Sequence, residues 1–299
     1  DVILYDWFAF AGRILAKDLG CPAIQIHAHF AHHHDSLMRV DGVCTNPETM
    51  VAFAHLLDAF MSTYGFEGKG HLWHFEKLNV FFIPREFQYD PDSFDSRFKL
   101  VGATHNRNRR AGAWKNRADD GKPLLLITEN TASMDERFLE LCIEAFAESQ
   151  YHVVFSKGLN SPEVSSELLP HNFEINQKVF NCEILPFANV MVCQGSMGPT
   201  LEALYHGVPV VAIPSNPYNA EVSYRLAELG LGLHLPGRSL TSSALREAVD
   251  TAYSDDTLLK RVKRMQDRVK DTPSAKLPAD AVEEFLADSR IRQCGTTDR

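Results

Sequence analysis

The stretch that most constrains the fold is 190–214, VMVCQGSMGPTLEALYHGVPVVAIP. Its pattern predicts a buried strand at Val190–Cys193, a glycine loop, a helix over Thr200–His206 and a second strand at Val208–Ile213. Pro199 fits the first turn of that helix, where its missing N–H costs nothing. A strand, glycine loop and helix in this order aim free amides at one point, which suits a phosphate or diphosphate. An ordinary α/β turn that carries two glycines is the alternative.

The composition is typical of a folded globular chain. With 299 residues, 44% of them hydrophobic and 23% charged, the chain is long enough for two domains. The net charge of −9 argues against a nucleic-acid partner. No apolar run reaches the roughly 18–20 residues that span a bilayer. The six cysteines show no CxxC or framework spacing, so we expect free thiols in a cytoplasmic protein.

The first residues predict a βαβ unit, with a strand at Val2–Tyr5, a helix at Trp7–Leu19 and a strand at Pro22–Ile26. Such a unit implies a parallel sheet. Because an apolar strand stands at the very start, we expect the chain to begin inside a domain. A further helix is expected from Pro47 to about Tyr64. We expect one apolar face on that helix, formed by Phe53, Leu57, Phe60, Met61 and Tyr64.

Residues 103–121 are polar, basic and short of aliphatic side chains, which predicts a linker. A second series of strands and helices begins at Leu124–Ile127, and a last amphipathic helix covers Leu277–Arg290. We therefore predict two α/β domains in tandem, with ligands at the carboxyl ends of the strands, in the cleft between the domains. The predicted boundaries are 1–102 for an incomplete first domain, 122–272 for the second, and 273–299 for a helix and tail that pack back on the first.

The segment VMVCQGSMGPTLEALYHGVPVVAIPSNPYNAEVSYRLAELGLG resembles the C-terminal domain of the UDP-glycosyltransferase-like family, the GT-B enzymes of macrolide, enediyne and plant natural products. DVILYDWFAFAGRILAKDLGCPAIQI resembles the end of their N-terminal domain, and the resemblance spans the whole chain. It implies two Rossmann-like domains that face each other across a cleft, the first one N-terminally truncated. It also implies an inverting transfer of a sugar from a UDP- or TDP-linked donor, with no other cofactor and no metal.

The resemblance assigns roles to individual residues. Glu202 matches the acid that holds the ribose hydroxyls of the donor, and a solvated helix glutamate is the alternative. Asp6 matches the acid that orients a catalytic histidine, which we expect upstream of this chain, so the fragment alone should be inactive. A helix N-cap is a second, compatible role for Asp6. The full set of expected donor-binding residues is Gln194, Gly195, Ser196, Gly198, Thr200, Glu202, Val179, Asn181, Tyr218, Asn219, Asn130 and Thr131.

Several of these positions differ from the family pattern. The family's histidine before the glycine loop is Gln194 here, which can donate a hydrogen bond but brings no positive charge. An acid–glutamine pair that reads the sugar hydroxyls is replaced by Tyr218 and Asn219. Glu129 stands near the expected diphosphate and should point away from it. These differences fit either an unusual donor sugar or a loss of transfer activity. The remaining differences lie at Lys178, Phe180, Asn181 and the turn 128–131.

Histidines follow the second predicted strand at His27, His29 and 32–34, and Asp35 comes next. This spacing could hold zinc but matches no strict metal motif, so a polar pocket wall or exposed loop is the preferred interpretation. By the resemblance, this region lines the acceptor pocket, for which Trp7, His27 and His29 are the candidates. Further aromatic residues suit an apolar acceptor, although we expect most of them in the core: Phe8, Phe10, Phe30, Phe53, Phe60, Trp73 and Phe75.

The preferred function is therefore an inverting hexosyltransferase that moves a sugar from a nucleotide diphosphate to a hydroxyl of a small, largely apolar acceptor. The first alternative is a non-catalytic binding or auxiliary protein of the same fold. A nucleotide-sugar 2-epimerase or lipid-linked GlcNAc transferase fits the loop spacing less well. The expected partners are the donor and the acceptor, and a homodimer is left open.

Overall fold

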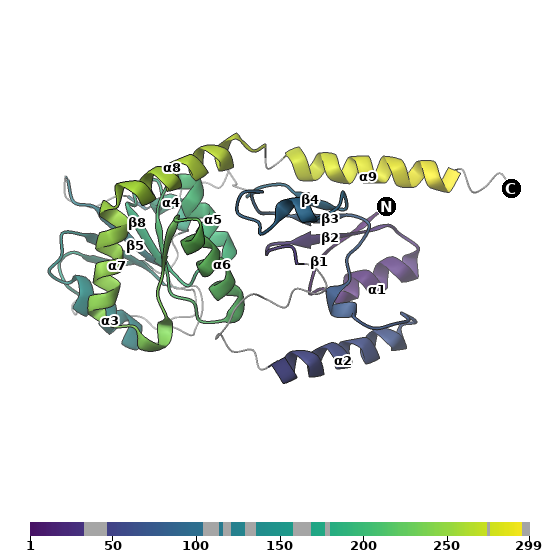
Figure 1. The fold of residues 1–299 in the computed structure, drawn as a ribbon, viewed down its shortest axis with the longest axis horizontal. Helices are drawn as coiled ribbons and strands as arrows, with labels where there is room; N and C mark the ends of the chain where they lie inside the picture. Colours follow the sequence, from purple (N-terminus) through teal and green to yellow (C-terminus); the bar gives the residue numbers. More distant parts are fainter. Residues whose placement is uncertain are drawn as a thin grey trace. The chain divides into compact units, whose positions relative to one another are not determined.

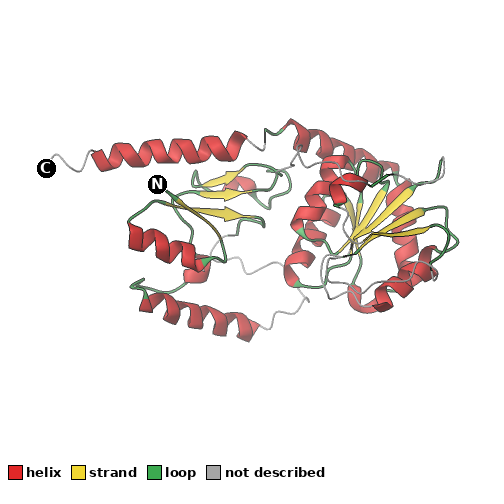
Figure 2. Ribbon diagram, turned by 180° about the vertical axis from the view of Figure 1, so that it is seen from behind, coloured by secondary structure: helices red, strands yellow, loops and turns green. Residues whose placement is uncertain are grey.

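The structure is a computed structural model, and it describes residues 1–32, 47–103, 114–115, 121–128, 136–157, 169–176, 180–273 and 276–294. The chain forms two compact units. Unit 1 comprises Asp1–Thr104 and Thr272–Arg299, and unit 2 comprises His105–Asp271. Each unit contains one parallel sheet with helices (Figures 1 and 2). The C-terminal helix therefore belongs with the N-terminal residues.

Unit 1 has a four-stranded parallel sheet in the order β1-β2-β3-β4. Its helix α1 ends at Gly20, whose left-handed φ of 60° lets its amide bond the last carbonyls of the helix. The strands are β1 (Ile3–Asp6), β2 (Ala23–His27), β3 (Asn79–Phe81) and β4 (Phe98–Leu100), and the α-helices are α1 (Phe10–Leu19), α2 (Pro47–Thr63) and α9 (Lys276–Cys294). Short 3₁₀ turns are formed by His71–Trp73 and Pro91–Ser93.

Helices lie on both sides of the unit 1 sheet (Figure 1). Helix α9 places Leu277, Ala281 and Phe285 against a small apolar cluster that includes Ile24 and Val80. On the other side α1 approaches the sheet closely, because a Cβ on Gly12 would lie 2.4 Å from the Cβ of Tyr5. This face of the sheet is partly polar, with Tyr5, Gln25, His27 and Asn79 buried along adjacent strands.

Unit 2 has a six-stranded parallel sheet in the order β10-β9-β8-β5-β6-β7. In chain order within the unit, this is the doubly wound arrangement in which the first and fourth strands are neighbours. The strands are β5 (Leu124–Thr128), β6 (His152–Ser156), β7 (Phe173–Asn176), β8 (Val190–Cys193), β9 (Val210–Ala212) and β10 (Gly232–His234). The helices are α3 (Glu136–Phe146), α4 (Asn181–Ile184), α5 (Met197–His206), α6 (Pro217–Glu228), α7 (Ser242–Ser254) and α8 (Asp256–Asp271), with a 3₁₀ turn at Gly237–Ser239.

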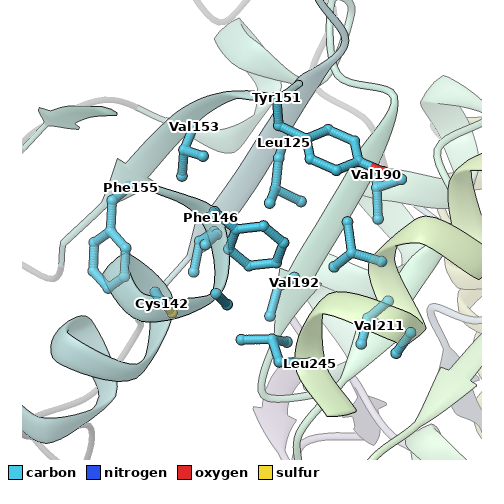
Figure 3. Packing of buried hydrophobic residues seen from close by; sticks show 14 of the residues in the cluster. Leu125, Cys142, Phe146, Tyr151, Val153, Phe155, Val190, Val192, Val211 and Leu245 are labelled. Carbon is cyan, nitrogen blue, oxygen red and sulfur yellow. The ribbon is translucent and has the colours of Figure 1, made fainter. Parts of the chain in front are cut away.

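The main core of unit 2 lies between one face of this sheet and helices α3 and α7. Phe146 and Cys142 of α3, together with Leu245 of α7, pack on strand residues such as Val153 and Val192 (Figure 3). The strands β5, β8 and β9 are buried along their whole length, as expected for strands covered on both faces. This explains why their sequences are continuous apolar runs without alternation.

Two expectations for unit 1 need correction. The first helix begins at Phe10 rather than Trp7, because the carboxylate of Asp6 accepts the amide of Phe8 and holds a turn before the helix. Helix α2 buries only Leu57 and Met61 of its expected apolar face. Phe53, Phe60 and Tyr64 remain exposed, because the helix contacts its neighbours along a narrower stripe than the apolar sequence covers.

Candidate functional site

The glycine loop follows the carboxyl end of β8, at the point where the unit 2 sheet reverses its strand order. Strand β8 pairs with β5 on one side and β9 on the other. Connections from β5 lead outward one way, to β6 and β7, and those from β8 lead the other way, to β9 and β10. Ligands of doubly wound sheets bind outside the carboxyl ends of the strands at this reversal. The fold therefore places the loop where a ligand site is expected.

Gly195 forms a left-handed turn at the centre of the loop, with φ of 72°. A Cβ here would lie 3.0 Å from the carbonyl oxygen of Asn219 and 3.3 Å from the Cβ atoms of Ala212 and Ser223. Its amide donates to the Sγ of Cys193 at 3.3 Å. Both the dihedral angle and the close packing explain why glycine occupies this position.

The helix α5 begins with free donors. Ser196 is its N-cap in extended conformation (φ −70°, ψ 147°), and its side chain makes no capping hydrogen bond. Pro199 has no N–H, and the Thr200 amide bonds the Ser196 carbonyl at 3.1 Å. The amides of Met197 and Gly198 therefore have no acceptor among the described residues, as is usual in a first helical turn. A Cβ on Gly198 would meet nothing within 4 Å, so the space beside this glycine is open.

The first turn of α6 stands next to the loop. The side chain of Asn216 caps this helix by accepting the Asn219 amide at 3.0 Å. Gln194 is buried, and its Oε1 accepts the hydroxyl of Ser215 at 3.4 Å. Asn219 is also buried, while Tyr218 remains partly exposed, and burial followed by the charge of Glu221 raises its pKa. The exposed residues of this turn are thus the capping Asn216 and the aromatic Tyr218.

Thr200 lies behind the loop rather than in front of it. Its side chain is fully buried, and the hydroxyl has no hydrogen bond of good geometry among the described residues, its polar neighbour being the Cys193 thiol. Burial raises the pKa of that thiol to about 11, against lowering contributions from Gly195 and Thr200. In this conformation Thr200 supports the turn from inside. Glu202, two residues further along α5, is half-buried.

Asp6 stands at the carboxyl end of β1 in unit 1, with an exposed side chain. One carboxylate oxygen accepts the amide of Phe8 at 3.0 Å, and the backbone carbonyl accepts the amide of Ala9 at 2.7 Å. The carboxylate makes no other hydrogen bond to a described residue. It therefore fixes the turn before α1 and keeps its second oxygen for another donor.

His27 and His29 form a short relay with the backbone. With both rings neutral, Nδ1 of His29 donates to the carbonyl of Phe30 at 2.9 Å, and Nε2 of His29 accepts from Nδ1 of His27 at 3.4 Å. His27 is fully buried and stacked on Phe81 at 4.1 Å. Burial, followed by electrostatic repulsion between the two rings when protonated, lowers the pKa of His27 to about 2. Its ring is thus a neutral core group, which counts against direct contact with an acceptor.

Trp7 is also a core residue. Its indole N–H donates to the carbonyl of Leu72 at 3.1 Å, and its ring contacts His29 at 4.6 Å. A cavity of about 720 Å³ in unit 1 is lined by aromatic side chains such as Trp73 and Phe75 together with charged ones such as Arg13 and Asp95. Its lining includes neither Trp7 nor the His27–His29 relay. Of the other aromatic candidates, Phe30 is buried, whereas Phe8, Phe53 and Phe60 are exposed.

Comparison with known proteins identifies relatives of this chain. Residues 143–287 match the family model described as the C-terminal domain of erythromycin biosynthesis protein CIII-like proteins. The chain is 34% identical to the NDP-glycosyltransferase YjiC of Bacillus licheniformis over 298 residues, which covers 98% of this chain and 74% of that protein. Its identity to the YjiC of Bacillus subtilis is 35% over 296 residues, with the same coverage of each chain. The chain belongs to the natural-product NDP-glycosyltransferase family.

A solved structure supports the same assignment for this glycosyltransferase. The calicheamicin glycosyltransferase CalG4 superposes with a TM-score of 0.79 and 29% identity, over 97% of this chain and 76% of that one. The fold is thus that of the GT-B glycosyltransferases, as the resemblance of the sequence predicted. The chain is accordingly a nucleotide-sugar-dependent glycosyltransferase, and its expected substrates are a donor and an acceptor.

Several expected features of the glycosyltransferase lie outside the described residues: Asn130, Thr131 and Val179 of the donor set, Glu129 and Lys178 among the differing positions, and residues 33–35 of the histidine segment. Asn181 is described and opens the short helix α4, directly after the half-exposed Phe180. Within the described ranges, no group of three His, Cys, Asp or Glu side chains is placed to hold a metal ion. None of the described helices is long and apolar enough to cross a membrane.

Some residues around the loop carry no signal in the sequence. Ser215, Ala212 and Ser223 touch the loop residues Gln194 and Gly195 only because β9 and α6 fold beside β8. A motif search reads along the chain and assigns no role to them. Their contribution becomes visible only in three dimensions.

Proposed function

We propose that this glycosyltransferase binds a UDP- or TDP-linked sugar at the start of α5 and transfers the sugar, with inversion, to a hydroxyl of a small apolar natural product. The observation that carries the proposal is the pair of unbonded amides of Met197 and Gly198 at the strand reversal of unit 2, with open space beside Gly198. Two amides at a helix N-terminus suit a diphosphate by both hydrogen bonding and helix dipole.

The proposed chemistry uses these amides on the leaving group. Negative charge grows on the diphosphate as the bond to the anomeric carbon breaks, and fixed dipoles stabilise it in the transition state. Such dipoles need no reorganisation during the reaction, so the proposal requires no metal ion. Glu202 is proposed to hold the ribose, because it lies on α5 about one turn beyond the amides.

On the acceptor side, Asp6 is proposed as a positioning residue for the histidine that deprotonates the acceptor. Its second carboxylate oxygen makes no hydrogen bond to a described residue, so it can accept the N–H of an imidazole and fix its tautomer. No described histidine contacts Asp6, so the base itself stays an inference from the resemblance. The exposed ring of Phe8, directly after the Trp7 position, offers apolar surface for an acceptor near this carboxylate.

Titration calorimetry of the 299-residue chain with UDP, TDP and GDP tests the donor assignment. The substitution Gly198→Trp adds a side chain into open space, so the fold should persist while binding of UDP or TDP weakens about tenfold or more. Ser243→Trp places the same side chain at the equivalent helical position of α7 and is the matched control. Binding that survives Gly198→Trp, or that falls equally with Ser243→Trp, would remove this site from consideration.

A non-catalytic binding protein is the second candidate, because Gln194 carries no charge and is buried with its oxygen bonded to Ser215. Release of UDP or TDP from a sugar donor in the presence of an acceptor decides between the two. Sustained release supports the enzyme, and tight nucleotide binding without release supports the alternative. A homodimer and a cytoplasmic location stay predictions.

A further inference from the structure

The glycine loop rests on a row of three side chains that cross the carboxyl edge of the unit 2 sheet. Ala212 of β9 is in register with Cys193 of β8 and with His234 of β10. Residues in register on neighbouring strands point to the same face of a sheet. The Sγ of Cys193 accepts the amide of Gly195, and the Cβ of Ala212 lies directly under this glycine. His234 is the third member of the row and does not touch the loop itself.

His234 acts on the loop through α6. Its Nδ1 lies 2.7 Å from the hydroxyl of Ser223, and its ring is stacked on Tyr224 at 4.4 Å. Ser223 is fully buried, and its Cβ is one of the three atoms that leave room only for glycine at position 195. The carbonyl of Asn219, one turn earlier on α6, is another. His234 thus links β10 to the face of α6 against which the loop packs.

The hydrogen-bond pattern favours a neutral His234. The hydroxyl of Ser223 has no other partner among the described residues, and a buried hydroxyl proton without an acceptor is costly. Donation from the Ser223 hydroxyl to an unprotonated Nδ1 satisfies both groups. Burial also lowers the pKa of His234 below its ordinary value, so the neutral ring is favoured. A protonated ring would donate to the hydroxyl instead and leave the hydroxyl proton without an acceptor.

Few other titratable groups face this ring. Among the described residues packed on β10, α6 contributes the stacked Tyr224, and β9 contains no titratable side chain. Helix α7 packs against the opposite face of β10, through Leu233, and its Arg246 and Asp250 pair with each other. The charge of His234 is therefore decided by the burial of its ring and by its hydrogen bond to the Ser223 hydroxyl.

We propose that Ser223 and neutral His234 are positioning residues for the diphosphate site, which hold α6 against Gly195 and thereby fix the amides of Met197 and Gly198. This inference rests on the proposed donor site. It also predicts that the two residues hold α6 against Gly195 in the protein without bound nucleotide. Ser223 and His234 both act on the loop through the packing of α6, and neither residue contacts the donor.

The test compares His234→Phe with His234→Asn. Phenylalanine keeps a ring against Tyr224 but offers no acceptor to Ser223, whereas the asparagine oxygen can occupy the place of Nδ1. We expect His234→Phe to weaken UDP or TDP binding about five- to tenfold, and His234→Asn to restore binding to within about twofold of the unmodified chain. His152→Phe, at the amino end of β6 in the same sheet, is the control for loss of a largely buried histidine. It should change the melting temperature without changing the affinity.

A pH series supplies a readout that a purely structural role would not give. Because the pKa of His234 is lowered on folding, its contribution is complete above the ordinary histidine value and declines as the pH falls through the folded value. Nucleotide affinity of the unmodified chain should therefore fall more steeply between about pH 7 and about pH 5 than that of His234→Asn. The nucleotide's own titration is common to both and cancels in the comparison. Equal slopes would overturn the role of the histidine.

Hydrogen exchange of the free protein separates this inference from the donor assignment. The amides of Gly195 and Thr200 have acceptors that depend on the loop conformation. In His234→Phe and Ser223→Ala they should exchange about tenfold faster than in the unmodified chain and in His152→Phe. Unchanged exchange overturns the positioning role even if the chain binds nucleotides. Faster exchange in a chain that binds no nucleotide supports the positioning role and rejects the donor site.

Discussion

Units 1 and 2 both build parallel sheets, but they bury their apolar residues to different degrees. In unit 2 the strands β5, β8 and β9 are covered on both faces and along their whole length. In unit 1 the edge strand β1 leaves Leu4 exposed, and helices α1 and α2 carry apolar residues on their outer sides. Among the described residues, the exposed large apolar side chains of unit 1 are Leu4, Phe8, Leu15, Leu19, Val51, Phe53, Leu56, Phe60 and Tyr64, against Phe180, Phe187, Tyr218 and Tyr224 in unit 2.

This difference has a physical meaning for each unit. The central strands of the unit 2 sheet are buried on both faces, so the stability of this unit is largely internal. Unit 1 combines exposed apolar surface with a polar sheet face that includes Tyr5 and His27. Glu76, in the segment before β3, contacts this face. Glu76 accepts the Tyr5 hydroxyl at 2.6 Å, and burial together with Glu76 raises the pKa of Tyr5. The comparison is consistent with the nucleotide binding that we propose for unit 2, and it leaves unit 1 with surfaces suited to apolar contacts.

The largest expected effect tests burial itself, with the same substitution in each unit. Phe146 of unit 2 is fully buried, whereas Phe60 of unit 1 is 47% exposed. Phe146→Ala should lower the free energy of unfolding by about 3–5 kcal/mol, because it removes a core ring and leaves a cavity. Phe60→Ala should change it by less than about 1 kcal/mol. Urea unfolding measures both, and similar losses would show that unit 1 is packed as tightly as unit 2.

The next effect compares two glycines with the same backbone requirement. Gly195 in unit 2 and Gly20 in unit 1 have φ values of 72° and 60°, so alanine should cost each roughly 1–2 kcal/mol of strain. Only at Gly195 would the new Cβ also meet a carbonyl, that of Asn219, at 3.0 Å. We expect Gly195→Ala to abolish measurable nucleotide binding and Gly20→Ala to leave it unchanged. Calorimetry with UDP and TDP checks this, and a loss in both variants would contradict a donor site confined to unit 2.

A smaller effect concerns acid stability and belongs to unit 1. Because burial lowers the pKa of His27 to about 2, the neutral ring stabilises the fold above the ordinary value of 6.5, and this contribution is lost as the pH falls. The slope in free energy of unfolding is at most about 1.4 kcal/mol per pH unit. His27→Phe keeps the ring stacked on Phe81 and should flatten the dependence below about pH 6 by that amount. Urea unfolding at several pH values measures the slopes, and parallel curves would contradict a buried neutral histidine.

The smallest expected effect lies within unit 2. Glu202→Ala should weaken UDP binding about fivefold, the value of one or two hydrogen bonds to the ribose, and leave pyrophosphate binding unchanged. Glu247→Ala removes an exposed glutamate of α7 and serves as the control. Competition calorimetry with the two ligands distinguishes the outcomes. Equal loss for UDP and pyrophosphate would assign Glu202 to the diphosphate or to the fold instead of the ribose.

Much of unit 2 could be predicted from local patterns. The strand at Val190–Cys193, the left-handed end of α5 at Gly207 (φ 74°) and the helices after it follow from apolar periodicity and glycine placement, which act over a few residues. The same patterns failed on α2, because its apolar stripe is wider than the surface it contacts. Exposure of Phe53 and Phe60 depends on which neighbours are present, and periodicity contains no information about them.

The sequence by itself determined the fold family, the glycine loop and the free amides at the start of α5, because turn geometry, helix ends and strand patterns are local properties of the chain. The tertiary structure decided which side chains support that loop. Thr200 faces inward, Gln194 bonds Ser215, and His234 acts through Ser223. These contacts join residues from separate strands and helices, so they exist only once β8, β9, β10 and α6 are packed together.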